Sequence, residues 1–119
     1  MLSLKTQSAT PLFTKEDIPR IVAEAFTAAK TAEAEYRAKH GEPGFCGFSW
    51  CNVSPGTSTV AKYLKANNLA RPSYSKGVDV WNPGGSHTQS MDIKEEGAYA
   101  FAKVLQAYGI KAYANSRAD

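Results

Sequence analysis

The sequence has few of the side chains from which metal sites and membrane spans are built. It contains two cysteines and two histidines among 119 residues, whereas a structural zinc site takes four such ligands at close spacing. We therefore expect no metal and no cofactor. No apolar run approaches the roughly 20 residues that cross a bilayer. Residues 1–14 carry one lysine and no long apolar stretch, so neither a secretory signal nor a membrane partner is expected.

The two cysteines, Cys46 and Cys51, lie five positions apart in the most strand-like segment of the chain. Side chains an odd number of positions apart on a strand point to opposite faces of the sheet. A disulfide between them is therefore not expected. Both are predicted to be buried free thiols in a reducing compartment, which favours a cytoplasmic protein.

The length and the hydrophobic content, 43%, fit one folded domain with its own core. The net charge is +3, and the excess lies in residues 44–91. That segment holds four basic side chains and one acid: Lys62, Lys65, Arg71, Lys76 and Asp79. An anionic partner, either nucleic acid or a phosphate-bearing small molecule, is one interpretation, and a solvated helix face with a basic loop is the other.

Helical and strand-like patterns alternate along the chain. Apolar residues at three- and four-residue spacing predict helices over 18–40, 58–67 and 92–108. Aromatic and β-branched runs predict strands over 45–53, 77–81 and 110–115. Residues 69–76 are expected to form a loop, since Pro72 disfavours the helical conformation for Arg71.

The order helix-strand-helix-strand-helix-strand is typical of crossover units in which helices cover a sheet. We expect a single α/β domain over residues 1–119, with a small three- to four-stranded, mainly parallel sheet covered by three helices. A mixed sheet is the alternative. Residues 1–13 are expected to be an edge strand or a loose lead-in.

A polar turn follows each predicted strand. In open parallel sheets ligands bind beyond the carboxyl ends of the strands, so residues 52–59, 82–89 and 115–119 would converge if the strands ran in one direction. Candidate ligand-binding residues come from these turns and from the basic segment: Ser54, Gly56, Thr57, Ser58, Thr59, Lys62, Arg71, Tyr74, Lys76, Asn82, Ser86, His87 and Arg117.

The turn at 54–59 resembles a phosphate-binding loop in composition only. It lacks the Gly-x-x-x-x-Gly-Lys-Ser/Thr pattern, and no lysine directly follows its glycine. A well-capped helix start is the alternative interpretation, with Thr57 or Ser58 as the cap.

His87 is the candidate general acid or base. Ser86 or Ser90 could act as the nucleophile, and Asp79 or Asp92 could orient the imidazole ring. A ligand contact and an exposed loop position are the alternatives for His87. Because no catalytic signature is present, a binding protein is expected more than an enzyme.

Aromatic and basic residues are interleaved in the second half of the chain. Trp50, Trp81, Tyr74 and Tyr113 could stack nucleic-acid bases while nearby cations, including Arg71, Lys76, Lys111 and Arg117, meet phosphates. The alternative is that Trp50 and Trp81 pack in the core as a cross-strand pair.

Three functions follow from these patterns. The leading hypothesis is a small binding module that holds an anionic ligand at the polar turns. A protein-interaction module, either a homodimer or an inhibitor of another protein, is the second. It is motivated by Tyr99 among Ala98, Ala102 and Ala107. A small hydrolase or transferase using His87 is the third.

Overall fold

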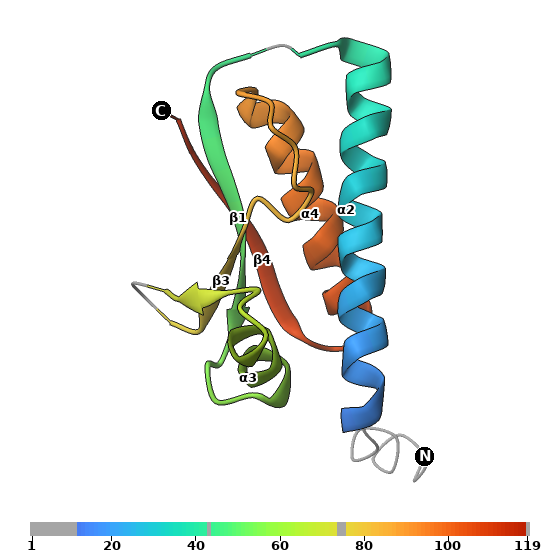
Figure 1. Ribbon diagram of the computed structural model, residues 1–119, viewed down its shortest axis with the longest axis vertical. Coiled ribbons are helices and arrows are strands. Elements are labelled where there is room, and N and C mark those ends of the chain that lie inside the picture. The colour runs from blue at the N-terminus through green and yellow to red at the C-terminus, as the bar shows by residue number, and fades with distance from the viewer. Residues whose placement is uncertain (1–11, 43, 74–75, 119) are drawn as a thin grey trace, which may run out of the picture.

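The computed structural model describes residues 12–42, 44–73 and 76–118, which form helices on one side of a four-stranded sheet (Figure 1). The elements in chain order are the 3-10 turn η1 (Lys15–Asp17), α2 (Ile18–His40), β1 (Gly47–Ser54), α3 (Thr59–Ala66), β2 (Arg71–Pro72), β3 (Val78–Trp81), α4 (Met91–Ala107) and β4 (Lys111–Ala118). In the described part of the chain, no helix has both the length and the apolar character needed to cross a membrane.

The predicted helices are confirmed, and their ends have local causes. Ser58 and Ser90 are the N-caps of α3 and α4, because their hydroxyl oxygens accept hydrogen bonds from the amides of Ala61 and Ile93. Asp92, the first residue of the predicted helix, lies in the first turn of α4. Gly109, at a φ of 82°, ends that helix in the left-handed region.

The sheet order is β2-β3-β1-β4, and every neighbouring pair is antiparallel. The prediction of a mainly parallel sheet is therefore wrong. The cause is β2, a two-residue strand inside the segment predicted to be a loop. The chain crosses from β1 through α3 to β2 and then reverses in a hairpin, so β3 runs opposite to β1. The result is the order of a split β-α-β fold.

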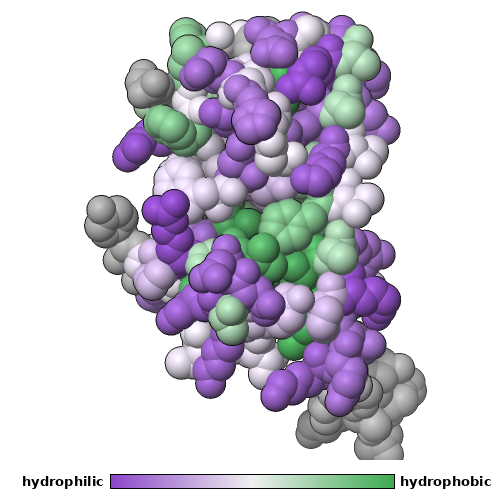
Figure 2. Space-filling model, viewed as in Figure 1, coloured by the Kyte–Doolittle hydropathy of each residue, from purple (hydrophilic) through white to green (hydrophobic). Residues whose placement is uncertain are grey.

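The helices cover only one face of this sheet. Figure 1 shows α2 and α4 on the same side, and the buried side chains of α3 belong to the same core. Along β1 the residues from Gly47 to Val53 are alternately buried against the helices and more exposed. Figure 2 shows hydrophobic atoms at the centre of the view, between flanking hydrophilic regions. In the described residues, no helix covers the other face.

Both cysteines are free thiols, as predicted, but only Cys51 is buried. Cys46 is exposed because it precedes β1 and is joined to the structure by a single bridge to Ser90. Burial, together with the nearby carboxylate of Asp79, raises the pKa of the Cys51 thiol to about 12. This thiol therefore stays protonated at neutral pH and has no nucleophilic character.

A carboxyl group is buried between α2, α4 and the loop after β3. Glu33 is 3% exposed, and its Oε2 has no hydrogen-bond partner among the described residues. Gly84 and Gly97 pack directly against this carboxyl, and a Cβ at either position would collide with it. Burial raises the pKa of Glu33, although Arg37, Lys30, Lys94 and a hydrogen bond with the Ser86 backbone act in the opposite direction.

The substitution Glu33→Gln tests the effect of this burial. The folded-state pKa of Glu33 lies above the ordinary value of 4.5. The folded state therefore favours the protonated carboxyl. The contribution of Glu33 to the free energy of unfolding is complete below the unfolded pKa, and it is lost as the pH rises through the folded pKa. We expect the variant to melt at a higher temperature than the parent at pH 7, and the difference to shrink towards pH 4.

Thermal melts followed by circular dichroism between pH 4 and pH 8 measure this difference. Glu35→Gln, at an exposed position on the same helix, is the matched control and should follow the parent at each pH. A constant difference between Glu33→Gln and the parent across the range would contradict the account.

Candidate functional site

The three polar turns do not meet at one edge of the sheet. Residues 54–59 follow β1, whereas 82–89 follow β3, which runs in the opposite direction. The two turns therefore lie at opposite ends of the sheet. The end of β4 lies at the same end as the second turn, since Arg117 pairs with Phe48 near the start of β1. The predicted common rim is wrong because it required parallel strands.

The turn at 54–59 forms the N-terminal cap of α3. Its Ser58 hydroxyl accepts from the Ala61 amide at 3.2 Å, and the Ser58 amide donates to the carbonyl of Pro55 at 3.0 Å. Gly56 lies against Gly77, at the start of the hairpin strand β3. Thr57, Thr59 and Lys62 are exposed around this turn. These contacts match the interpretation of a capped helix start.

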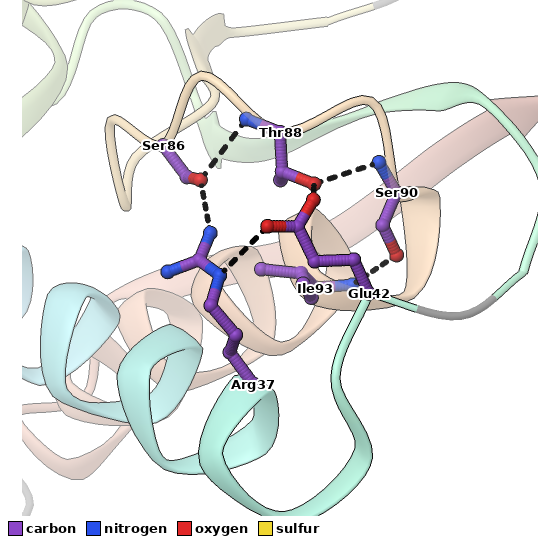
Figure 3. A network of polar contacts seen from close by, with 6 residues as sticks. All are labelled: Arg37, Glu42, Ser86, Thr88, Ser90 and Ile93. Atoms are coloured by element: carbon purple, nitrogen blue, oxygen red, sulfur yellow. Dashed lines mark hydrogen bonds and ion pairs between the residues drawn. The ribbon is translucent and has the colours of Figure 1, made fainter.

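The turn at 82–89 is fastened to α2 by a network of polar side chains (Figure 3). The Arg37 guanidinium donates to the Ser86 hydroxyl at 2.7 Å and pairs with the Glu42 carboxylate at 3.2 Å. Thr88 donates to the same carboxylate at 2.6 Å, and this bond lowers the pKa of Glu42. Two of the candidate hydroxyls are used here, since Ser86 accepts from Arg37 and Ser90 caps α4.

The expected catalytic pair of His87 and Asp79 is not formed. His87 is exposed in the loop, whereas Asp79 is buried on β3 and accepts from the Asn52 amide at 2.9 Å. The same Asn52 amide donates to the backbone carbonyl of Lys76 at 2.7 Å. No hydrogen bond or ion pair joins His87 to Asp79 within the described ranges. Those ranges also contain no group of three or more His, Cys, Asp or Glu side chains that could hold a metal.

Aromatic side chains gather on the uncovered face of the sheet instead. Trp50 on β1 faces Trp81 on β3, with ring centroids 4.5 Å apart and planes inclined by 34°. The amide of Asn82 donates to the carbonyl of Ser49, so the backbone groups of Ser49 point towards β3. Because this direction alternates along a strand, the backbone groups of Trp50 point towards β4. Trp50 and Trp81 therefore form a non-hydrogen-bonded pair, the kind in which opposite side chains come closest. The cross-strand pair that the sequence offered as the alternative interpretation is therefore formed, but Trp81 is 38% exposed and does not lie in the core.

Basic residues border this aromatic face, which we call the open face. On β4, Tyr113 lies opposite Asn52, and Arg117 lies opposite Phe48, with its guanidinium 5.6 Å from the Phe48 ring. At the opposite edge of the sheet, Arg71 on β2 lies opposite Asp79 on β3. Tyr74, a further candidate, lies outside the described residues.

The open face is hollowed at its centre. The depression has a volume of about 510 Å³ and is lined by Trp50, Asn52, Ser73, Asp79, Trp81, Tyr113, Asn115 and Arg117. Three strands, β1, β3 and β4, and the β2–β3 hairpin supply these residues, so they converge only in the folded sheet. Planar aromatic walls, amide groups and one guanidinium at the rim suit a flat, polar-edged and negatively charged ligand.

Sequence reasoning found the aromatic and basic residues of this face but not their arrangement. Phe48, Asn52 and Asn115 were not among the candidates. The signal that could have found them is the period of two along each strand. It places Phe48, Trp50 and Asn52 on one side of β1, and it places Asn115 with Tyr113 and Arg117 on one side of β4. Comparisons of the chain with family models, curated proteins and solved structures found no match.

Replacing Arg37 tests the polar network of Figure 3. Arg37→Ala removes the donor that ties Ser86 and Glu42 to α2. Because a net hydrogen bond to a charged group contributes about 1.5–3 kcal/mol, we expect a loss of stability of that order. We also expect faster hydrogen exchange at the amides of Thr88 and Ser90.

Chemical denaturation and amide exchange measured by mass spectrometry check both outcomes. Lys39→Ala, at an exposed position one half-turn away on α2, should change neither. Equal behaviour of the two variants would show that the network does not hold the loop.

Proposed function

We propose that the protein binds single-stranded nucleic acid on the open face of its sheet. The observation that supports this most directly is the outward-facing pair of Trp50 and Trp81, with Tyr113 and Phe48 exposed beside it. Stacking on aromatic side chains is worth about 1–3 kcal/mol per base and works for any base, because every base has a π-face.

The exposure of these rings supports a binding role. Phe48 and Trp81 are each 38% exposed, and Tyr113 is 57% exposed. A single exposed aromatic residue needs no explanation, but several exposed rings on one sheet face are typical of an interaction site. The four rings come from three adjacent strands, so a strand of nucleotides could cross the face and meet them in succession.

The charges on this face favour a negatively charged ligand. Arg71, Lys111 and Arg117 are exposed on its outer strands, β2 and β4. The acid on this face, Asp79, is 7% exposed and is hydrogen-bonded to Asn52, so it presents little negative surface. Guanidinium and ammonium groups at the rim can contact phosphates while the bases stack at the centre.

The shape of the face favours single strands over duplexes. A duplex hides the flat surfaces of its bases in the stack and is read through its grooves by a helix or ribbon. An exposed, aromatic sheet surface instead suits unpaired bases that can be splayed out. Asn115, which is exposed and lies opposite Trp50, could donate to and accept from the edge of a stacked base.

Fluorescence anisotropy with labelled ten-nucleotide uridine and thymidine strands tests the proposal. We expect Trp81→Ala to weaken binding by about 1–3 kcal/mol, or roughly tenfold to a hundredfold. Arg117→Ala should weaken binding less and reduce its salt dependence, because it removes one phosphate contact. The uridine and thymidine arms distinguish RNA from DNA as the preferred ligand.

Lys62→Ala is the matched control for Arg117→Ala. Lys62 is an exposed cation on α3, beside the turn that the sequence suggested as an anion site, and its loss should leave affinity unchanged. Melting curves of each variant establish that the fold is retained. Binding that needs Lys62 but not Trp81, or no salt-sensitive binding to either strand, would contradict the proposal. Equal affinity for a mononucleotide would indicate a nucleotide site instead.

A further inference from the structure

The outer edge of β4 is unpaired in the described part of the chain, since β4 is the last strand in the sheet order. The direction of its backbone groups follows from two contacts. The carbonyl of Asn115 accepts from the Ser49 hydroxyl on β1 at 2.7 Å, whereas the carbonyl of Ala112 accepts from the Gln106 side chain of α4 at 2.6 Å. Because these directions alternate along a strand, Ala114 and Ser116 point their amides and carbonyls away from β1.

A stripe of α4 runs beside this edge. It consists of Glu95, Tyr99, Lys103 and Gln106, which recur at three- and four-residue spacing. The Glu95 carboxylate accepts from the Ser116 hydroxyl at one end, and Gln106 contacts Ala112 at the other. Between them Tyr99 is 57% exposed, with the Lys103 ammonium 5.3 Å from its ring centroid. A depression of about 340 Å³ lies between Tyr99 and the strand.

We propose that a second copy of this chain pairs with the β4 edge, antiparallel and about a twofold axis at Asn115. In this register Ala114 of each copy lies opposite Ser116 of the other, so the outward backbone groups form four hydrogen bonds. Tyr113 lies opposite Arg117 of the second copy on the open face, where a guanidinium and an aromatic ring attract. This proposal does not depend on the proposed function.

An adjacent register, with the axis at Ala114, is less favourable. An axis at Ala114 would place Lys111 directly opposite Arg117 of the second copy, and like charges in that position are destabilising. It would also need the Ala112 carbonyl, which Gln106 already occupies. An axis between two residues would bring opposite faces of the sheet together, because side chains alternate with a period of two.

The stripe on α4 has the charge pattern that a twofold axis requires. Glu95 and Lys103 lie four residues to either side of Tyr99, which is beside Ala114 and Asn115. Rotation about this point places Glu95 of one copy near Lys103 of the other, twice in each dimer. Such self-complementarity is the condition for an interface that uses the same patch on both copies. The dimer would have one eight-stranded sheet, with the two open faces side by side.

Sedimentation equilibrium of the full chain, without nucleic acid, tests this proposal. We expect a mass of twice 12.9 kDa. Glu95→Lys and Lys103→Glu should each weaken self-association about tenfold, because each creates two repulsive pairs by symmetry. The double variant Glu95→Lys, Lys103→Glu should restore dimerisation. Lys62→Glu, the same charge change at a distant helix, is the control and should remain dimeric.

Ser116→Pro provides a second test that does not depend on surface charge. Proline removes the outward Ser116 amide and the hydroxyl that donates to Glu95, but no bond to β1, so the fold should persist while the dimer dissociates. A parent chain that stays monomeric at millimolar concentration would overturn the proposal. So would a dimer that is unaffected by Ser116→Pro and by both single charge reversals. Nucleic-acid binding by a monomer would leave the proposed function standing and remove only this inference.

Discussion

Coverage of the sheet on one face only is the constraint on which the rest of the structure depends. Side chains alternate along each strand, so packing α2, α3 and α4 on the face of Cys51, Val53 and Val80 leaves the other residues on the open face. Trp50 and Trp81 lie opposite each other there, and a larger covering layer would have buried them. The strand order, in turn, leaves β4 at an edge, with α4 packed against it. The aromatic surface therefore follows from the layers, and the unpaired edge follows from the order of the strands.

The elements of this fold could be predicted from the sequence, but the direction of its strands could not. Periodic apolar residues marked α2, α3 and α4, and Ser58 was one of the two predicted caps of α3. The strand that decides the topology is β2, which consists of Arg71 and Pro72 alone. Two residues have no periodicity, and Pro72 argued only against a helix, so the segment was predicted to be a loop. Missing β2 removed one reversal of the chain, so β3 was expected to run parallel to β1 when it runs antiparallel.

The direction of β3 also determines where the candidate site lies. In a parallel sheet both faces are covered, and Trp50 and Trp81 would then belong to the core. In the antiparallel sheet one face stays open, and the same two residues lie on it. The polar turns were expected to bind a ligand, but several of their hydroxyl groups form hydrogen bonds within the fold. Ser58 and Ser90 cap helices, and Ser86 accepts from Arg37 on a helix distant in sequence. Composition alone does not distinguish a cap from a ligand contact.

Both tryptophans of the chain lie on the open face, so two indole N–H signals report on it directly. The most direct test is a two-dimensional ¹H–¹⁵N spectrum of the protein, recorded while a ten-nucleotide single strand is added. We predict that both indole signals shift in a saturable manner, together with the amides of Tyr113 and Asn115, while the amides of residues 56–62 stay in place. Unmoved indole signals, alongside shifts at 56–62 or no shifts at all, would contradict the claim that this face is the binding surface.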